Sequence, residues 1–272
     1  RISNSKNIKV SYDSEALAFN EEDNKQTLFY KQKLEKKSVD CDLLVLADGG
    51  KSKIKGIDIK KTNKSFDHSA LVSCVETDIP HSNVAYERFT SMGPMALLPN
   101  LNGKYSLVWT GPKKDIKSLI GLSDSEFLIA LQDHFGDRVG NFELCEKRIT
   151  FPLKQSFISK YPKENIAIIG NSAQVMHPVA GQGLNTGIRD AFILADCIES
   201  EDTNLDIKSM INKFNDMRKL ETKNIVKLTE SLVTIFSNDF VGLNKFRGIA
   251  LSFLDLIPPL KKRFVKKMSY GK

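Results

Sequence analysis

Two short apolar runs, each ending at a turn that contains glycine, constrain the fold of this 272-residue chain most strongly. Residues 42–47 form the first run and lead into Asp48-Gly49-Gly50, and residues 166–169 form the second and lead into Gly170. A strand with one wet face alternates between apolar and polar residues, whereas a strand buried on both faces is apolar throughout. The two runs therefore predict buried strands of the kind found in a parallel sheet.

Other segments predict antiparallel strands and helices. Ser123 and Glu126 form a capping box, and the helix that it opens carries Phe127, Leu131 and Phe135 on one face. Short strand-like runs, separated by turn signals, cover 8–12, 28–30, 70–75, 84–89, 95–98 and 105–110. Longer helices are predicted over 184–199 and 206–237.

Composition and charge exclude several classes of protein. Hydrophobic residues make up 41% of the chain and charged residues 27%, as in globular proteins. Six basic residues within 258–272 account for all but one unit of the net charge of +7, so no broad basic face predicts a nucleic-acid partner. Four scattered cysteines form no CxxC pair and fit a reducing compartment. His68, His81 and His134 lack metal-ligand spacing, so no metal site is predicted.

The segment 170–190 carries the strongest functional signal. It combines a buried strand, a loop of small residues and a helix, and Gly181 and Gly183 let the backbone approach a ligand closely. The start of the helix favours an anion, or a ring system that becomes anionic. The alternative is an ordinary strand–loop–helix connection whose glycines serve only to turn the chain.

This segment resembles the second flavin-contacting motif of the aromatic-ring flavoprotein monooxygenases, the p-hydroxybenzoate hydroxylase-like group. The matching residues follow the order of that motif: Gly170, Ala173, Pro178, Gly181, Gln182, Gly183, Leu184, Asn185, Gly187 and Asp190. A second set resembles the family's Asp-Gly-x-x-Ser-x-x-Arg motif, which lies beside flavin and pyridine nucleotide: Asp48, Gly49, Ser52 and Lys55. Lysine at position 55 keeps the charge of the usual arginine but loses its planar fork.

At two positions the segment departs from the usual motif, and the residues found there resemble those of one branch of the family. Asn171 replaces the usual Asp and Gln174 the usual His, and His177 and Pro178 follow. These changes resemble the 2-polyprenyl-6-methoxyphenol hydroxylase branch of ubiquinone biosynthesis. Further stretches are similar to the same branch: 87–90, 93–99, 106–109 and 257–263.

The resemblance implies an α/β (α+β) fold of the FAD/NAD(P)-binding, p-hydroxybenzoate hydroxylase-like type. The sequence contains no Gly-x-Gly-x-x-Gly, so we expect a C-terminal part that lacks the N-terminal βαβ unit, binds FAD weakly or not at all and is inactive alone. The implied domains are the remainder of the FAD-binding domain (1–66), an antiparallel substrate-domain sheet (67–150), the flavin-ring motif (151–200) and C-terminal helices with a basic tail (201–272).

The implied activity is that of a FAD-dependent monooxygenase. In the family NAD(P)H reduces FAD, and one oxygen atom of O₂ is transferred to an electron-rich ring, here that of a polyprenylphenol. The implied cofactor-binding residues are Asp48, Gly49, Ser52, Lys55, Gly170, Asn171, Pro178, Gly181, Gln182, Gly183, Leu184 and Asn185. His177 is either a general base for the phenol or a histidine that packs beside the loop, and the residues leave both open.

Two alternatives remain open for the function. The protein could act on a soluble aromatic compound, or it could be a non-catalytic assembly subunit that retains the fold. The basic tail is either a solvated helix or a contact to an anionic membrane surface or a ubiquinone-biosynthesis assembly. The expected location is cytoplasmic, peripheral to the inner membrane.

Overall fold

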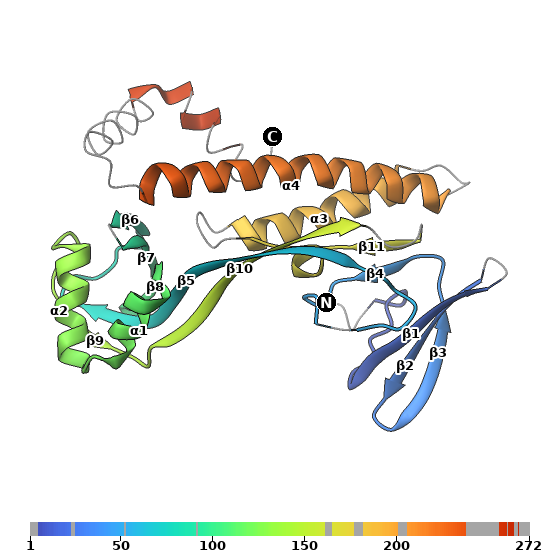
Figure 1. The fold of residues 1–272 in the computed structure, drawn as a ribbon, viewed down its shortest axis with the longest axis horizontal. Helices are drawn as coiled ribbons and strands as arrows, with labels where there is room; N and C mark the ends of the chain where they lie inside the picture. The colour runs from blue at the N-terminus through green and yellow to red at the C-terminus, as the bar shows by residue number, and fades with distance from the viewer. Residues whose placement is uncertain are drawn as a thin grey trace. The chain divides into compact units, whose positions relative to one another are not determined.

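A computed structural model of the chain divides it into two compact units (Figure 1). The first unit comprises Arg1–Asn63, Ser156–Val175 and Gly183–Thr222, and the second comprises Lys64–Gln155, Met176–Gln182 and Lys223–Lys272. The structure describes residues 5–22, 25–51, 53–90, 92–160, 165–176, 182–200, 206–237, 256–259, 261–263 and 266, with backbone alone at 182 and 225–237.

The first unit contains two small sheets. The strands of the antiparallel sheet are β1 (Ser14–Glu22), β2 (Lys25–Gln32) and β3 (Glu35–Asp40). The parallel pair consists of β4 (Leu44–Leu46) and β11 (Ile166–Ile168), with Leu44 opposite Ile166 and Leu46 opposite Ile168. The parallel strands predicted from the apolar runs are therefore confirmed.

Both faces of β11 are buried, which explains its unbroken apolar sequence. Ala167 lies in one apolar cluster and its neighbours Ile166 and Ile168 lie in another. The Ala167 cluster includes residues of α3 (Gln182–Glu199) and α4 (Ile207–Ser237): Leu194, Cys197, Met210, Ile211 and Phe214. The opposite cluster includes Phe19 of β1 and the two buried leucines of β4. Helices and the antiparallel sheet thus cover opposite faces of the parallel pair.

The second unit is built on an antiparallel sheet with two helices. Its strands are the larger part of β5 (Lys60–Thr77), β6 (Tyr86–Thr90), β7 (Gly93–Pro99), β8 (Tyr105–Pro112), β9 (Phe142–Cys145) and part of β10 (Ile149–Lys160). The order along the whole sheet is β12-β10-β5-β8-β7-β6, where β12 is Gln174–Val175 and β9 pairs with β5. The sheet predicted over 67–112 is confirmed.

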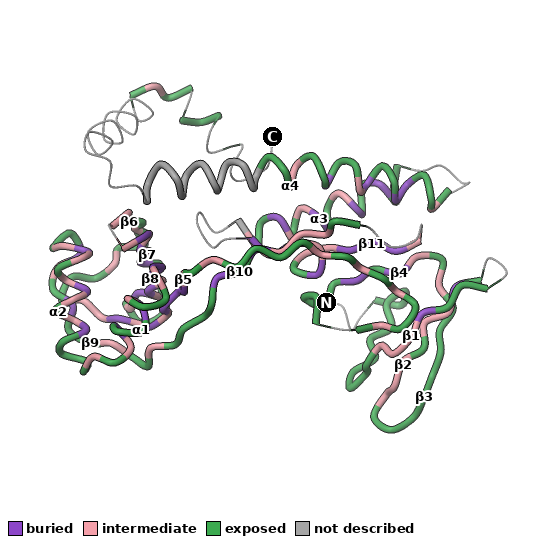
Figure 2. Tube along the Cα trace, viewed as in Figure 1, coloured by how far each residue is buried: buried purple, intermediate pink, exposed green. Residues whose placement is uncertain are grey.

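The core of this unit lies between the sheet and the helices α1 (Lys113–Gly121) and α2 (Asp124–Phe135). Figure 2 shows buried residues gathered along β7, β8 and α2. Trp109 is fully buried and lies 5.0 Å from His134 between ring centroids. The predicted capping box is present, since Ser123 accepts the Glu126 N–H and Glu126 accepts the Ser123 N–H. Phe127, Leu131 and Phe135 are buried as the helical spacing predicts.

One predicted strand is wrong. Residues 8–12 alternate but form no strand, and Ile8, Val10 and Tyr12 are all exposed. An alternating segment becomes a strand only when a neighbour supplies hydrogen bonds and an apolar surface. The meander β1–β3 begins only at Ser14 and includes strand residues that are charged and exposed.

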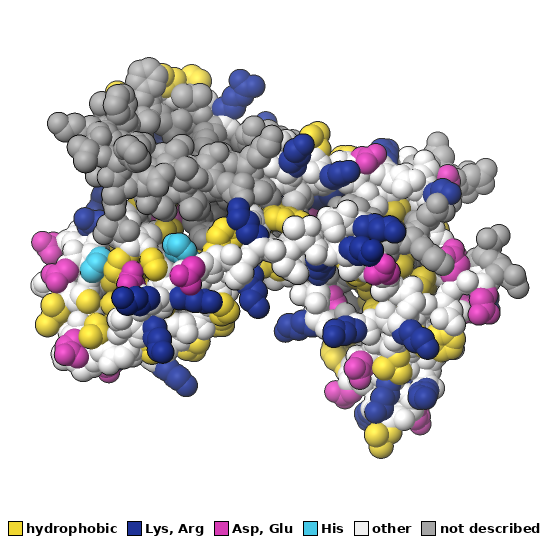
Figure 3. Space-filling model, in the orientation of Figure 1, with side chains coloured by type: hydrophobic (Ala, Val, Ile, Leu, Met, Phe, Trp, Pro, Cys, Tyr) yellow, Lys and Arg dark blue, Asp and Glu magenta, His cyan; other side chains and the backbone are white. Residues whose placement is uncertain are grey.

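The surface of the described residues is mixed in charge. On the face drawn in Figure 3, Lys and Arg side chains lie among acidic and polar ones. Within the basic tail, the described residues Lys261, Lys262 and Arg263 are helical and exposed. None of the helices in the described part of the chain combines the length and the hydrophobicity that a membrane-spanning segment needs.

Candidate functional site

Two turns in the first unit follow the carboxyl ends of the parallel strands. Because β4 and β11 run in the same direction and in register, Asp48-Gly49-Gly50 and the 3₁₀ turn η3 (Gly170–Ser172) leave the pair at the same edge. In open α/β sheets this edge is where ligands bind. The structure thus brings together the two segments that the sequence singled out separately.

A hydrogen-bonded triangle joins the two turns. The Ser172 hydroxyl donates to Asp48 Oδ1 at 2.6 Å, and the Gly50 N–H lies 3.0 Å from the Ser172 oxygen. The Gly50 N–H also reaches Asp48 Oδ1 at 2.9 Å. Ser172 is 1% exposed, whereas Asp48 is exposed. The buried hydroxyl therefore fixes the position of a carboxylate that faces solvent.

Glycine is required in this region by conformation and by space. Gly49 and Gly50 both have φ of +73°, in the left-handed region. A Cβ placed on Gly50 would lie 3.3 Å from the carbonyl oxygen of Asn171 and 2.7 Å from Lys61 Nζ. The two turns consequently approach each other at Gly50 so closely that a side chain there would need the Asn171 carbonyl and Lys61 to shift.

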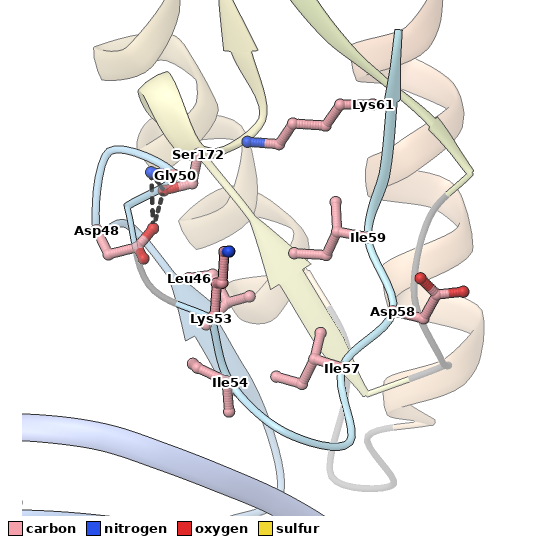
Figure 4. A pocket seen from close by; sticks show the side chains of 10 residues that line it. All are labelled: Leu46, Asp48, Gly50, Lys53, Ile54, Ile57, Asp58, Ile59, Lys61 and Ser172. Carbon is pink, nitrogen blue, oxygen red and sulfur yellow. Dashed lines mark hydrogen bonds between the residues drawn. The ribbon is translucent and has the colours of Figure 1, made fainter.

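A cavity of about 310 Å³ opens beside the triangle (Figure 4). Its lining combines apolar side chains with acidic and basic ones: Leu46, Asp48, Gly50, Lys53, Ile54, Ile57, Asp58, Ile59, Lys61 and Ser172. In Figure 4 the Lys61 side chain extends toward Gly50 and Ser172. The cavity therefore offers two ammonium groups close to the turn at Asp48.

Lys55, predicted as a cofactor-binding residue, does not line this cavity. Its backbone pairs with β1, donating to the Leu17 carbonyl at 2.9 Å and accepting from the Phe19 N–H at 2.8 Å. Its side chain is exposed. Lys53 and Lys61 take the cavity positions instead, and only Lys53 lies near the motif in sequence.

The first turn of α3 presents an open backbone. A Cβ placed on Gly183 would meet no atom within 4 Å, and Leu184 and Asn185 are exposed. The first N–H groups of a helix have no partner within it, and they carry the positive end of the helix dipole. This turn can therefore accept a negatively charged or oxygen-bearing edge. Ser52, His177, Pro178 and Gly181 lie outside the described residues.

Glycine also lets α3 pack directly on η3. A Cβ placed on Gly187 would lie 3.3 Å from the Cα of Gly170. One helical turn further on, Asp190 accepts the N–H of Gly170 at 2.8 Å. Burial raises the pKa of the Asp190 carboxyl, and Arg218 and the Gly170 N–H oppose that rise. Two residues of the motif are thus in direct contact.

Sequence comparison decides the family. A family model described as "FAD binding domain" matches residues 3–227. The chain belongs to the FAD binding domain family. FAD is accordingly the cofactor of this family, and the resemblance found in the sequence is confirmed at the level of the family.

Individual relatives agree with this family. The chain is 30% identical over 235 residues to the ubiquinone hydroxylase UbiL of Rhodospirillum rubrum, covering 84% of this chain and 54% of that protein. It is 28% identical over 265 residues to the ubiquinone biosynthesis monooxygenase COQ6, mitochondrial, of Drosophila melanogaster, covering 83% and 55%. The chain thus spans about half the length of these curated relatives.

A solved structure supports the fold. The anhydrotetracycline hydroxylase OxyS of Streptomyces rimosus superposes with a TM-score of 0.66 at 16% identity, over 97% of this chain and 53% of that chain. At that identity the likeness concerns the fold alone. The mixed α/β fold with an antiparallel sheet, expected from the resemblance, is confirmed.

The described residues fit one end of FAD. The flavin ring has an edge of carbonyl and imide groups on which negative charge develops on reduction, and the open amides of Gly183, Leu184 and Asn185 offer donors to such an edge. No side chain at Gly183 obstructs its approach.

Four contributors to the site were not assigned a role from the sequence: Ser172, Lys53, Lys61 and Arg218. Ser172 could have been found, because residues that follow two adjacent parallel strands meet at one edge. Lys61 and Arg218 carry no local signal, since their positions depend on how a later strand and helix pack.

Proposed function

We propose that this protein is a FAD-dependent monooxygenase that hydroxylates the aromatic ring of a polyprenylphenol in ubiquinone biosynthesis. The observation that carries the proposal is the junction of the two turns, where Ser172 holds Asp48 beside an open cavity. Membership of the FAD binding domain family and similarity to ubiquinone hydroxylases support the same reading.

Bound FAD would supply the redox chemistry, taking electrons from NAD(P)H and delivering one oxygen atom of O₂ to the ring. The residues of the chain supply position and charge. The amides of Gly183, Leu184 and Asn185 would stabilise negative charge on the edge that they contact. A helix terminus contributes at most about 2 kcal/mol, equivalent to roughly one and a half pKa units, so direct N–H hydrogen bonds supply the rest.

The turn at Asp48 would contact the ligand on a second side of the site, in addition to the amides of α3. Gly49 and Gly50 expose backbone there, and the buried Ser172 hydroxyl keeps the Asp48 carboxylate in one position. Lys53 and Lys61 place positive charge along the cavity, which suits phosphate groups of FAD or NAD(P)H.

His177 and the basic tail complete the proposal. His177 would take the phenol proton, which makes the ring richer in electrons before oxygen transfer. The exposed Lys261, Lys262 and Arg263 would contact an anionic membrane surface or a ubiquinone-biosynthesis assembly near a bilayer-borne substrate. Deleting residues 258–272 should reduce binding to anionic vesicles, and unchanged binding would remove the role of the tail.

The test is a quinone profile of cells that lack the gene for this protein, measured by mass spectrometry. Loss of ubiquinone and accumulation of a polyprenylphenol lacking one hydroxyl group is the expected result. An unchanged quinone profile would contradict the substrate and favour a soluble aromatic compound.

A matched variant separates catalysis from assembly. Gly183→Val fills the open first turn of α3, whereas Gly121→Val adds the same side chain at the end of α1 in the second unit, where a Cβ also meets nothing within 4 Å. We expect Gly121→Val to restore the quinone and Gly183→Val to fail. Restoration by both, with both proteins present at equal abundance, would favour the non-catalytic assembly subunit.

A further inference from the structure

A buried ionic cluster lies behind the turn at Gly170, outside the residues that contact solvent at the site. Asp190 of α3 is 1% exposed and Arg218 of α4 is 4% exposed. Arg218 Nη2 lies 2.5 Å from Asp190 Oδ1, while Asp190 Oδ2 accepts the Gly170 N–H at 2.8 Å. One carboxylate therefore connects the cofactor-site turn to a helix that no sequence motif includes.

The same turn of α4 makes two more contacts. Glu221 accepts hydrogen bonds from Arg218 and, at 2.8 Å, from Arg189 of α3. Thr222 donates to Gln174 Oε1 at 2.5 Å, and the amide nitrogen of Gln174 faces Asp190 at 3.4 Å. Two guanidinium groups and two carboxylates thus balance in charge within the cluster.

An isolated buried carboxylate tends to take up a proton, because burial disfavours the charged form. Burial is the largest influence on the pKa of Asp190 and raises it, and Arg218 is the largest opposing influence. A protonated carboxyl group is a weaker acceptor than a carboxylate for an N–H. The strength of the Gly170 bond therefore depends on Arg218.

We infer that Arg218 is a positioning residue of the cofactor site, which keeps Asp190 ionised and thereby fixes the turn Gly170–Ser172 through the Gly170 amide. This inference depends on the proposed function only in one respect, which is that FAD is the ligand of the site. Gly187 contributes to the effect, since its missing side chain lets α3 lie directly against Gly170. Ser172 lies in the same turn and donates a hydrogen bond to Asp48, so fixing the turn also fixes the position of Asp48.

The test follows the Gly170 amide by NMR in protein labelled with ¹⁵N-glycine, without flavin, between about pH 5 and 8. In the unaltered chain we expect slow hydrogen exchange at the Gly170 amide. In Arg218→Met the pKa of Asp190 rises further, so the Gly170 shift should titrate at a higher pH than in the unaltered chain. Exchange should be about tenfold faster. The variant should lose stability as the pH rises through that pKa and regain it as the pH falls.

Three further variants identify the titrating group. Arg218→Lys keeps the charge and should leave the pH dependence of the Gly170 shift as it is in the unaltered chain. Asp190→Asn combined with Arg218→Met should abolish the titration. Glu221→Gln removes the other carboxylate that faces Asp190 but leaves the pair of Arg218 and Asp190, and it should leave the Gly170 shift as in the unaltered chain.

Two results would overturn the inference: a Gly170 amide unchanged in Arg218→Met, or a titration that survives the double variant. If Arg218→Met fails to fold, Asp190→Asn decides the matter. It should speed exchange at Gly170 about tenfold at every pH, and unchanged exchange would overturn the inference. A separate FAD titration tests the proposed function. If no FAD binding were observed, the conclusion from the Gly170 amide would still hold.

Discussion

The buried hydroxyl of Ser172 donates a 2.6 Å hydrogen bond to Asp48, a residue 124 positions earlier in the chain. This bond joins the turns that follow two adjacent parallel strands, and the Gly50 N–H reaches both of its members. The two turns therefore behave as one structural element of the candidate site.

Ser172→Ala should lower the free energy of unfolding by about 1.5–3 kcal/mol, the usual value of a hydrogen bond to a charged group. It should also weaken FAD binding, because Asp48 loses the hydrogen bond from the buried Ser172 hydroxyl. Urea denaturation and a flavin titration measure the two effects. Ser159→Ala is the control, since its hydroxyl makes an exposed bond to the Lys60 carbonyl in the same unit. Equal losses in both variants would contradict a special role for Ser172.

Gly49→Ala and Gly50→Ala form a matched pair, because both residues have φ of +73°. Each substitution should cost about 1–2 kcal/mol of stability from the left-handed backbone. Gly50→Ala should cost at least about 1 kcal/mol more, since its Cβ would press on the Asn171 carbonyl. Thermal or urea unfolding measures the difference. Identical stabilities would mean that the two turns are not in contact at Gly50.

Gly183→Ala should separate stability from function. A Cβ at this position meets nothing within 4 Å, and alanine favours the helix, so the free energy of unfolding should stay the same or rise by up to about 1 kcal/mol. FAD affinity should nevertheless fall, because the methyl group occupies the space that the ligand needs. Gly121→Ala should leave the affinity unchanged. A variant at Gly183 that binds FAD normally would argue against the amide contact.

Ser123→Ala should remove the cap of α2 at a cost of about 1 kcal/mol. The hydrogen bond from the Ser123 side chain is the main reason that the pKa of Glu126 lies below its ordinary value. Such a group stabilises the fold above its ordinary pKa, and the contribution disappears as the pH falls through the lowered value. The difference in the free energy of unfolding between Ser123→Ala and the unaltered chain should therefore become smaller at acid pH. Ser118→Ala, on the exposed face of α1, should show no such dependence.

The fold was predictable where burial leaves a pattern. The parallel strands, the capping box and the face of Phe127, Leu131 and Phe135 all follow from apolar spacing and turn chemistry. Within the meander β1–β3 only the middle of β2, residues 28–30, was predicted, because β1 and β3 include exposed, charged residues. The alternation over residues 8–12 was misleading, since alternation alone does not supply a neighbouring strand.

The site was predictable as two segments but not as an assembly. The glycines and Asp48 follow from the resemblance to a flavin-binding family. The cavity position of Lys61 and the pairing of Arg218 with Asp190 depend on the packing of β5 and α4. Neither residue stands near a motif, so their roles required coordinates.

The most direct test of the account is an FAD titration of ¹⁵N-labelled protein followed at individual amides. The amides of Gly49, Gly50, Gly183, Leu184 and Asn185 should shift together, whereas those of the second unit, such as Gly103 and Gly121, should stay in place. Shifts confined to other regions, or no shift at these amides with FAD at several millimolar, would contradict the assignment of the flavin site.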